Sequence, residues 1–347
     1  MDGGSPPPAS TTLKTSHNRH ITNSNVVYTY TDYKERKMLE MILPLVGLTL
    51  AGASVISNDA VQTLGTFMVS NKKTEWWKLW CPAAAVLITT ILYSWINYNG
   101  DKSYGRLENI PYVTVQWYHA LAPGVLLLLT RLGIPVSTTF LVLSAFATGV
   151  VFEKMLIKSM LGYTVSAVFA YSLWMGLSRL LDEKKKVKKD QEKYWRVAQW
   201  FTTGFLWFTW LTHDLANIAV FAPREMSGLY VSGVIVLLVS LLAFMFWEKG
   251  GKIQEIVTSK SSTSYVRSAT IIDAAYAFVL LYLKEMNNIP MSTTWVFVGL
   301  LCGRELAIAT TYGRKIKQVF PMIIKDFLKM LLGLAVSVFI ILIVHKL

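Results

Sequence analysis

Two short polar motifs occur twice in this chain, and both pairs are separated by the same offset. An Asn-Asp pair at residues 58–59 is followed by Pro-Val-Ser-Thr-Thr at 135–139, and a His-Asp pair at 213–214 is followed by Pro-Met-Ser-Thr-Thr at 290–294. The two acids are 155 positions apart, and so are the first hydroxyls of the two Ser-Thr-Thr stretches. Two unrelated coincidences would not share one offset, so the chain contains an internal duplication.

The duplicated motifs lie in or beside long apolar stretches. Of the 347 residues, 53% are hydrophobic and 16% are charged, which is typical of a polytopic helical membrane protein and too apolar for a soluble domain. A polar constellation repeated within a membrane predicts a transport site between two related halves. The net charge of +13 comes from basic residues in loops. Without a basic-aromatic module, it indicates orientation across the bilayer and not nucleic-acid binding.

The order of apolar stretches divides the chain into two repeats. Residues 1–38 are polar and are expected to form a disordered tail. We expect a first transmembrane repeat over residues 39–181, a basic cytoplasmic linker over 182–196 and a second transmembrane repeat over 197–347. The linker is expected to be solvated, and contact with anionic lipid is compatible with its charge.

Each repeat contains one segment that we interpret as a re-entrant hairpin of two half-helices. Two apolar arms, each short for a full span, flank the Pro-x-Ser-Thr-Thr tip in residues 115–152, and residues 268–310 repeat the arrangement. Proline disfavours helix at the residue before it, and Ser or Thr can cap the next helix. Non-helical backbone at membrane depth is tolerated where it lines a cavity or is buried in protein. Two complete spans joined by a loop are the alternative.

Counting each hairpin as zero crossings leaves three crossings per repeat, and an odd number inverts the second repeat relative to the first. The expected fold class is therefore an all-α polytopic membrane protein of two inverted repeats, each with three transmembrane crossings and one re-entrant helical hairpin. Loops at 71–78, 182–196, 248–267 and 313–317 would then share one side, and they are rich in Lys and Arg. The positive-inside rule makes that side cytoplasmic and places both termini outside.

The two acids are expected to carry the coupling chemistry. A charged carboxylate at membrane depth requires a cation, a proton or a donor-rich partner. Carboxylate and side-chain amide oxygens suit a hard cation, so Asp59 and Asp214 would be the metal ligands if the coupling ion is Na⁺, and would carry the proton if it is H⁺. The predicted cation-binding residues are Asn58, Asp59, Gln62, Asp214 and Asn217. We also expect His213 to belong to the ion or substrate site.

The two Pro-x-Ser-Thr-Thr tips offer the opposite chemistry. Hydroxyl donors and free N–H groups at the start of a half-helix suit a tetrahedral oxyanion. The alternative is that these hydroxyls only cap or bridge helices. The predicted substrate-binding residues are Ser137, Thr138, Thr139, Ser292, Thr293 and Thr294.

The four motifs resemble those of the inorganic phosphate transporter (PiT) family, which are cation-coupled phosphate permeases. That family carries a Gly-Ala-Asn-Asp-x-Ala-Asn type signature in each of two inverted halves, each followed by a Pro-x-Ser-Thr-Thr-His tip. The resemblance covers about residues 40–345 and implies Na⁺- or H⁺-coupled symport, external termini and often a homodimer. Gln62 and His213 replace Asn residues of the signatures, and Phe140 and Trp295 replace the His that follows each tip.

We therefore expect a symporter of inorganic phosphate in a plasma or inner membrane, with the lipid bilayer as its other partner. A permease for sulfate or another oxyanion remains an alternative, because the departures from the family pattern bear on the substrate. A transport-inactive receptor or scaffold on the same fold is a second alternative. An enzyme is not expected, because no nucleophile–base or metal-ligand set and no phosphate-binding loop motif is evident, and no cofactor is expected beyond the coupling ion.

Overall fold

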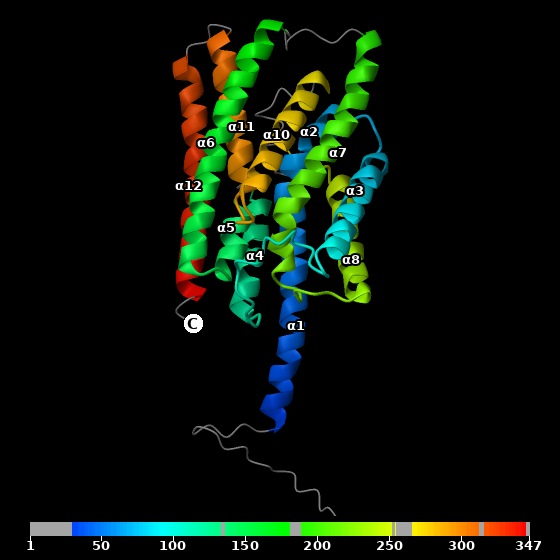
Figure 1. The fold of residues 1–347 in the computed structure, drawn as a ribbon, viewed down its shortest axis with the longest axis vertical. Coiled ribbons are helices and arrows are strands. Elements are labelled where there is room, and N and C mark those ends of the chain that lie inside the picture. Colours follow the sequence, from blue (N-terminus) through cyan, green and yellow to red (C-terminus); the bar gives the residue numbers. More distant parts are fainter. Residues whose placement is uncertain are drawn as a thin grey trace, which may run out of the picture. The chain divides into compact units, whose positions relative to one another are not determined.

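The computed structural model describes residues 30–132, 136–180, 189–251, 254, 266–311 and 316–344. All the elements assigned to these residues are helices, as the sequence predicts (Figure 1). The chain separates into two compact units, residues 1–42 and 43–347, and the site lies in the second. Most of the predicted N-terminal tail, linker positions 182–188 and Pro135 lie outside the described residues.

The helices follow the order expected from the apolar stretches. In the first half they are α1 (Tyr30–Val55), the π-helical turn η1 (Ile56–Ala60), α2 (Val61–Ser70), α3 (Trp76–Asn97), α4 (Trp117–Arg131), α5 (Thr138–Val142), the 3₁₀ turn η2 (Leu143–Ala145) and α6 (Gly149–Leu180). In the second half they are α7 (Lys189–Ala219), α8 (Gly228–Trp247), α10 (Val266–Met286), α11 (Thr293–Thr311) and α12 (Ile316–Val344).

Within the described residues, six helical stretches are long and apolar enough to cross a membrane. They are Lys37–Ser70, Trp76–Asn97, Gly149–Leu177, Gly228–Trp247, Val266–Met286 and Val319–Ile343. Five coincide with crossings that the apolar stretches predict, at residues 39–70, 82–98, 160–181, 228–247 and 320–344. The sixth, α10, was expected to be a hairpin arm. A crossing was expected at residues 200–220, but α7, which contains them, is not apolar enough to be counted among the six. The first turns of α7 are charged and its remainder mixes aromatic residues with Thr, Gln and His, which lowers its hydropathy.

The long first crossing changes its winding at the Asn58-Asp59 pair. The sequence predicts a broken or tilted helix there, and the structure instead shows five π-helical residues, Ile56–Ala60, between α1 and α2. Such a turn is a local bulge inside a helix and is frequent at functional sites. The equivalent pair in the second half lies in the uninterrupted helix α7. The two acids are therefore presented by different backbone geometries.

The two tip-bearing segments enter the bundle from opposite ends. Figure 1 shows α4 and α5 in the lower part of the helix bundle and α10 and α11 in its upper part. The second arm of the first hairpin is shorter than predicted, since α6 already begins at Gly149. No proline interrupts residues 149–180, so the stretch expected to complete the hairpin joins the long helix instead.

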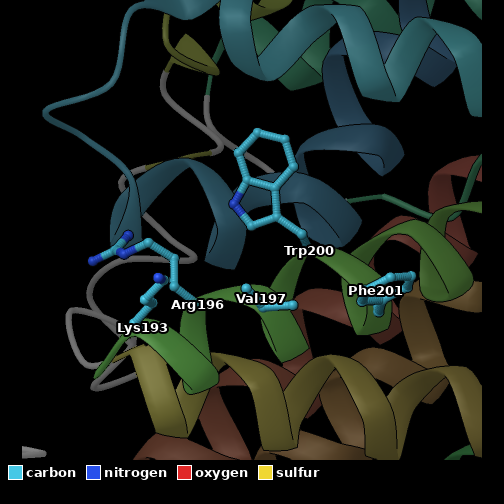
Figure 2. Close-up of a pocket in the computed structure, with 5 residues that line it drawn as sticks. All are labelled: Lys193, Arg196, Val197, Trp200 and Phe201. Carbon is cyan, nitrogen blue, oxygen red and sulfur yellow. The ribbon is translucent and has the colours of Figure 1, made fainter. Parts of the chain in front are cut away.

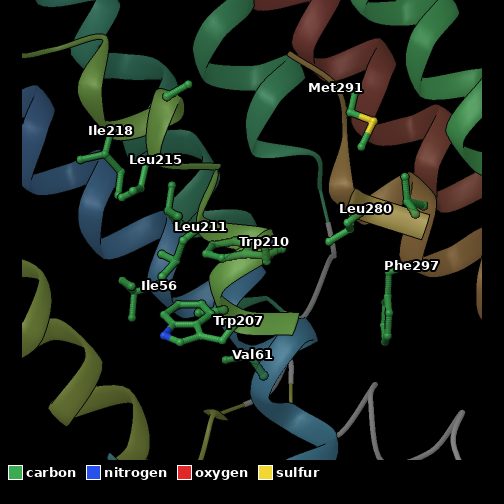
Figure 3. Packing of buried hydrophobic residues seen from close by; sticks show 14 of the residues in the cluster. Ile56, Val61, Trp207, Trp210, Leu211, Leu215, Ile218, Leu280, Met291 and Phe297 are labelled. Atoms are coloured by element: carbon green, nitrogen blue, oxygen red, sulfur yellow. The ribbon is translucent and has the colours of Figure 1, made fainter. Parts of the chain in front are cut away.

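Residues 189–196, which the sequence analysis assigns to the linker, form the first turns of α7. Lys, Glu, Gln and Arg are good helix formers, so this charged stretch extends the helix that follows it. Further along, α7 carries the packing core of the bundle. Trp207 and Trp210 stack with ring centroids 4.9 Å apart. Figure 3 shows this pair together with Ile56 and Val61.

Helices α6 and α11 approach each other closely through two glycines. A Cβ on Gly299 would collide with the carbonyl of Tyr163, and a Cβ on Gly303 would collide with the carbonyl of Ala167. Glycines four residues apart allow two helix backbones to touch, an arrangement common among transmembrane helices. This contact fixes the helix that begins at the second tip against the long helix α6.

Candidate functional site

The carboxylate of Asp59 lies at the centre of the candidate site and is fully buried. Its Oδ1 accepts hydrogen bonds from Asn58 Nδ2 at 2.7 Å, from Thr294 Oγ1 at 3.2 Å and from Gln62 Nε2 at 3.4 Å. Its Oδ2 accepts from Thr138 Oγ1 in a very short contact. Thr138 belongs to the first tip and Thr294 to the second. One acid therefore receives hydroxyl donors from both halves of the chain.

The two tips also contact each other directly. Thr139 Oγ1 donates to the carbonyl of Met291 at 3.0 Å, which links the first tip to the second. Asn58 Nδ2 donates to the carbonyl of Val136 at 2.7 Å, which links the first tip to the π-helical turn. Residues 78 and 152 positions apart in sequence are thus brought together. The structure therefore brings the first acid motif and both tips together.

The two tip serines have a capping role in this structure. Ser137 Oγ accepts from the N–H of Phe140 at 3.3 Å, and Ser292 Oγ accepts from the N–H of Trp295 at 3.2 Å. Each satisfies an N–H group of the first turn of the following helix. The capping alternative therefore describes these two residues, whereas the hydroxyls of Thr138 and Thr294 point to Asp59. The carbonyl of Thr293 accepts from Tyr276 OH at 2.9 Å.

Asp214 is buried on α7 and is bonded less completely than Asp59. Asn217 Nδ2 donates to Asp214 Oδ1 at 2.8 Å, and the equivalent pair in the first half is Gln62 with Asp59. Among the described residues, no hydrogen-bond donor reaches Asp214 Oδ2, Asn217 Oδ1 or Asn58 Oδ1. The two carboxylates are close enough to interact electrostatically. The hydroxyl of Thr293, from the second tip, also lies near this acid. Asp214 Oδ2 and Asn217 Oδ1 nevertheless remain buried acceptors without a donor in the described part of the chain.

His213 is buried beside Asp214 and connects α7 to α10. Its Nε2 lies 2.9 Å from the carbonyl of Leu280, which can only accept, so we assign the ring proton to Nε2. Nδ1 is then an acceptor, and within the described part of the chain it has no partner. The motif that this chain resembles has an asparagine amide at this position. Here the corresponding group is the Nδ1 atom of His213.

Arg106 was not singled out by the sequence analysis, although the structure places it against the second acid motif. Its side chain is fully buried, and Nε donates to the carbonyl of Thr212 at 2.6 Å. Nη1 has no partner among the residues described. Burial lowers the pKa of Arg106 to about 10, and the charge of Asp214 opposes that shift. The guanidinium therefore remains charged at neutral pH beside the site.

Two neighbouring residues of α6, also not predicted, hold the second tip in place. Lys158 Nζ donates to the carbonyls of Asn287 at 2.8 Å and Ile289 at 2.9 Å. The N–H of Ser292 donates to Ser159 Oγ at 2.9 Å. The three accepting or donating backbone groups belong to the non-helical residues between α10 and α11. Both α6 side chains thus position the tip and do not face Asp59.

A third buried acid, Asp273 on α10, has a bridging role. Its Oδ1 accepts from Thr66 Oγ1 at 2.6 Å and its Oδ2 from Thr203 Oγ1 at 2.5 Å. These hydroxyls come from α2 and α7, so the carboxylate joins three helices. Both of its oxygens have protein donors, which distinguishes it from Asp214.

Comparison with known proteins adds one structural relative. No protein-family model matches the chain, and no curated protein gives a significant match. A solved structure described as the sodium-dependent phosphate transporter superposes with a TM-score of 0.61 at 16% sequence identity. The match covers 89% of this chain and 100% of that one.

The fold and the spans define the class of this protein. It is an all-helical integral membrane protein that shares its fold with a solved phosphate transporter. Within that fold, Asp59, both tips and the second acid motif are gathered in the interior of the bundle.

Proposed function

We propose that the protein is a cation-coupled transporter of inorganic phosphate. The observation that carries the proposal is the carboxylate of Asp59, which is held by Thr138 from one tip and Thr294 from the other. The donors that surround a buried carboxylate are the donors that a tetrahedral oxyanion requires. Asp59 therefore accepts the hydrogen bonds that the two hydroxyls would otherwise donate to the substrate.

This arrangement explains why an anion site would need a cation. Phosphate brought next to a charged Asp59 and Asp214 would be repelled strongly in a medium of low dielectric. A cation bound to Asp59 draws the carboxylate away from Thr138 and Thr294 and leaves their hydroxyls to the oxyanion. Cation binding and anion binding then depend on each other through the same two hydrogen bonds.

The surroundings of Asp214 support a second cation position. Its Oδ2 and the Oδ1 atom of its hydrogen-bond partner Asn217 are buried acceptors with no donor among the described residues. Buried acceptors are costly without a partner, and hard cations take carboxylate and amide oxygens as ligands. Na⁺ suits this set, and H⁺ would use the carboxylates alone.

The acids also favour phosphate over sulfate. Monohydrogen phosphate carries a proton that it can donate to a carboxylate, whereas sulfate at neutral pH has no proton to donate. A carboxylate that leaves the hydroxyls but stays beside the bound anion therefore gives phosphate one hydrogen bond that sulfate lacks. We expect sulfate to compete weakly.

The test is uptake of labelled phosphate by purified protein in proteoliposomes, under imposed Na⁺ or H⁺ gradients. Wild-type protein should accumulate phosphate under one gradient, and excess sulfate should inhibit poorly. Asp59→Asn and Asp214→Asn should each abolish gradient-driven uptake, and Glu153→Gln, an exposed acid on α6, should not. Uptake at the wild-type rate by both Asn variants would show that the acids are structural.

The same experiment distinguishes the alternatives. A permease for sulfate would accumulate sulfate in preference to phosphate. A receptor or scaffold would accumulate neither anion under either gradient, although the protein is folded and inserted.

A further inference from the structure

A groove of about 520 Å³ lies on the outer face of α7 near its start, away from Asp59. It is lined by Lys193, Arg196, Val197, Trp200 and Phe201 (Figure 2). These positions recur at intervals of three and four residues, so they form one face of the helix. Two cations therefore stand at one end of the groove, and two aromatic side chains one to two turns further along.

The loop after α2 adds positive charge to the same end. Arg196 Nη1 donates to Asn71 Oδ1 at 2.7 Å, which places the loop beside the groove. Lys72 and Lys73 follow directly and are exposed. Arg196 also pairs with Glu192 at 2.9 Å, and both partners are partly exposed. On the same loop Glu75 pairs with Lys78 at 3.0 Å. These two carboxylates, Glu75 and Glu192, are outnumbered by five cations, so the region is positive.

The apolar part of the groove faces outward. The exposed fraction of Val197 is 53% and that of Phe201 is 75%. Trp200 is fixed by an edge-to-face contact with Phe67, with ring centroids 5.2 Å apart. Next to the lysines of the loop, Trp76 and Trp77 are also exposed, as expected for aromatic residues at a membrane interface. Cations thus lie directly beside apolar surface that would face acyl chains.

We propose that this groove is a binding site for an anionic phospholipid. The headgroup phosphate would contact Lys193 and Arg196, and an acyl chain would run along Trp200 and Phe201. Basic residues clustered beside a membrane surface recognise anionic headgroups in this way. A second copy of the chain fits the groove poorly, because a symmetric contact through this face would bring its excess positive charge against the same charge on the other copy.

The site can be tested by quenching of tryptophan fluorescence with bromine-labelled lipids. Full-length protein is reconstituted into phosphatidylcholine vesicles that contain brominated phosphatidylglycerol or, in parallel, brominated phosphatidylcholine. The contribution of Trp200 is the difference between wild-type protein and Trp200→Phe. We expect brominated phosphatidylglycerol to quench this contribution more strongly at equal content.

Removal of one cation should weaken the preference for the anionic lipid. Each basic residue near a membrane surface is worth about 1 kcal/mol, so Lys193→Gln should lower the preference about 5-fold and Lys193→Gln with Lys72→Gln about 30-fold. Lys154→Gln is the matched control, because Lys154 is exposed on the first turns of α6, at the opposite end of the bundle from the start of α7 (Figure 1). It should leave the quenching of Trp200 unchanged.

Three results would overturn the proposal. Equal quenching by the two lipids would show no anionic preference, and equal effects of Lys193→Gln and Lys154→Gln would show that the charge acts without a local site. Displacement of the lipid by excess inorganic phosphate would assign the cations to a soluble anion. None of these readouts requires transport, so the outcome is independent of the proposed function.

Discussion

Phe140 and Trp295, which are equivalent residues of the two repeats, pack against each other with ring centroids 5.3 Å apart. Each follows its Pro-x-Ser-Thr-Thr tip directly, and both are buried. A two-fold axis that relates the repeats would carry each of these residues onto the other. Because the two residues touch, such an axis would pass between them. The pair therefore supports an axis between the tips, next to the hydroxyls that hold Asp59.

Truncation of this pair should destabilise the protein. Phe140 is 0% exposed, and Phe→Ala in a packed core typically costs about 3–5 kcal/mol because it leaves a cavity. We expect a clear loss of unfolding free energy for Phe140→Ala, measured by thermal or denaturant unfolding in detergent. Phe339→Ala on α12 is the control, since its side chain is 64% exposed and leaves no cavity. Equal stability of the two variants would mean that the tips do not depend on this contact.

Removal of Asp59 should uncouple anion binding from the cation. In the proposed mechanism the carboxylate competes with phosphate for Thr138 and Thr294, and hydrogen bonds to charged groups are worth about 1.5–3 kcal/mol. Equilibrium binding of labelled phosphate to wild-type protein should therefore strengthen about 10–100-fold when Na⁺ replaces a large inert cation. Asp59→Ala should bind phosphate without Na⁺ and show little response to it.

The tip hydroxyls provide the complementary measurement. Thr138→Val keeps the shape of the side chain and removes one donor, so phosphate binding should weaken about 10–100-fold. Thr164→Val is the control, because Thr164 is exposed and its hydroxyl donates to the carbonyl of Met160 on the same helix. The outcome that contradicts the Asp59 prediction is also clear. If phosphate binding to Asp59→Ala depends on Na⁺ as strongly as binding to wild-type protein, the carboxylate does not compete with the substrate, even if the protein transports phosphate.

The sequence predicts the helical membrane fold and the approach of the tips because both depend on information that is local or repeated. Long apolar stretches predict membrane helices, and the shared offset of 155 residues indicates the duplication. The structure brings the two tips together through the contact between Thr139 and Met291. The inverted relation of the repeats, the ligand roles and the coupling ion remain predictions.

Other parts of the site depend on contacts that no local pattern reports. Arg106 lies in a polar loop, and it reaches α7 only because the loop turns back through left-handed backbone at Asn99 and Tyr104. Lys158 sits within a transmembrane helix, where its partners are carbonyls far away in sequence. The different environments of Asp59 and Asp214 arise from tertiary packing, since their sequence motifs are nearly equivalent.

Lys102 predicts a pH dependence of stability. Burial lowers the pKa of this loop lysine to about 8, and Nζ donates to the carbonyl of Pro223 at 2.6 Å. Between pH 8 and about 10.5 the unfolded chain holds a proton that the folded protein has lost, so stability rises with pH over this window. The gain should reach about 2–3 kcal/mol and should be absent in Lys102→Met. Parallel pH profiles of the two proteins would contradict the prediction.

Arg106 should strengthen substrate binding through its charge. The guanidinium is anchored on the carbonyl of Thr212 and lies near Asp214, so it adds a fixed positive charge beside the proposed anion site. Arg106→Gln should weaken phosphate binding about 10-fold or more, whereas Arg106→Lys keeps the charge and should retain most of it. Arg224→Gln is the matched control, because Arg224 is a loop arginine that donates to the carbonyl of Ile110 and carries the same charge. Each variant should be measured by equilibrium binding of labelled phosphate and by unfolding. Phosphate binding could weaken in both Arg106→Gln and Arg106→Lys while both variants also lose stability. That result would make Arg106 a packing residue of the loop and not a contributor to anion binding.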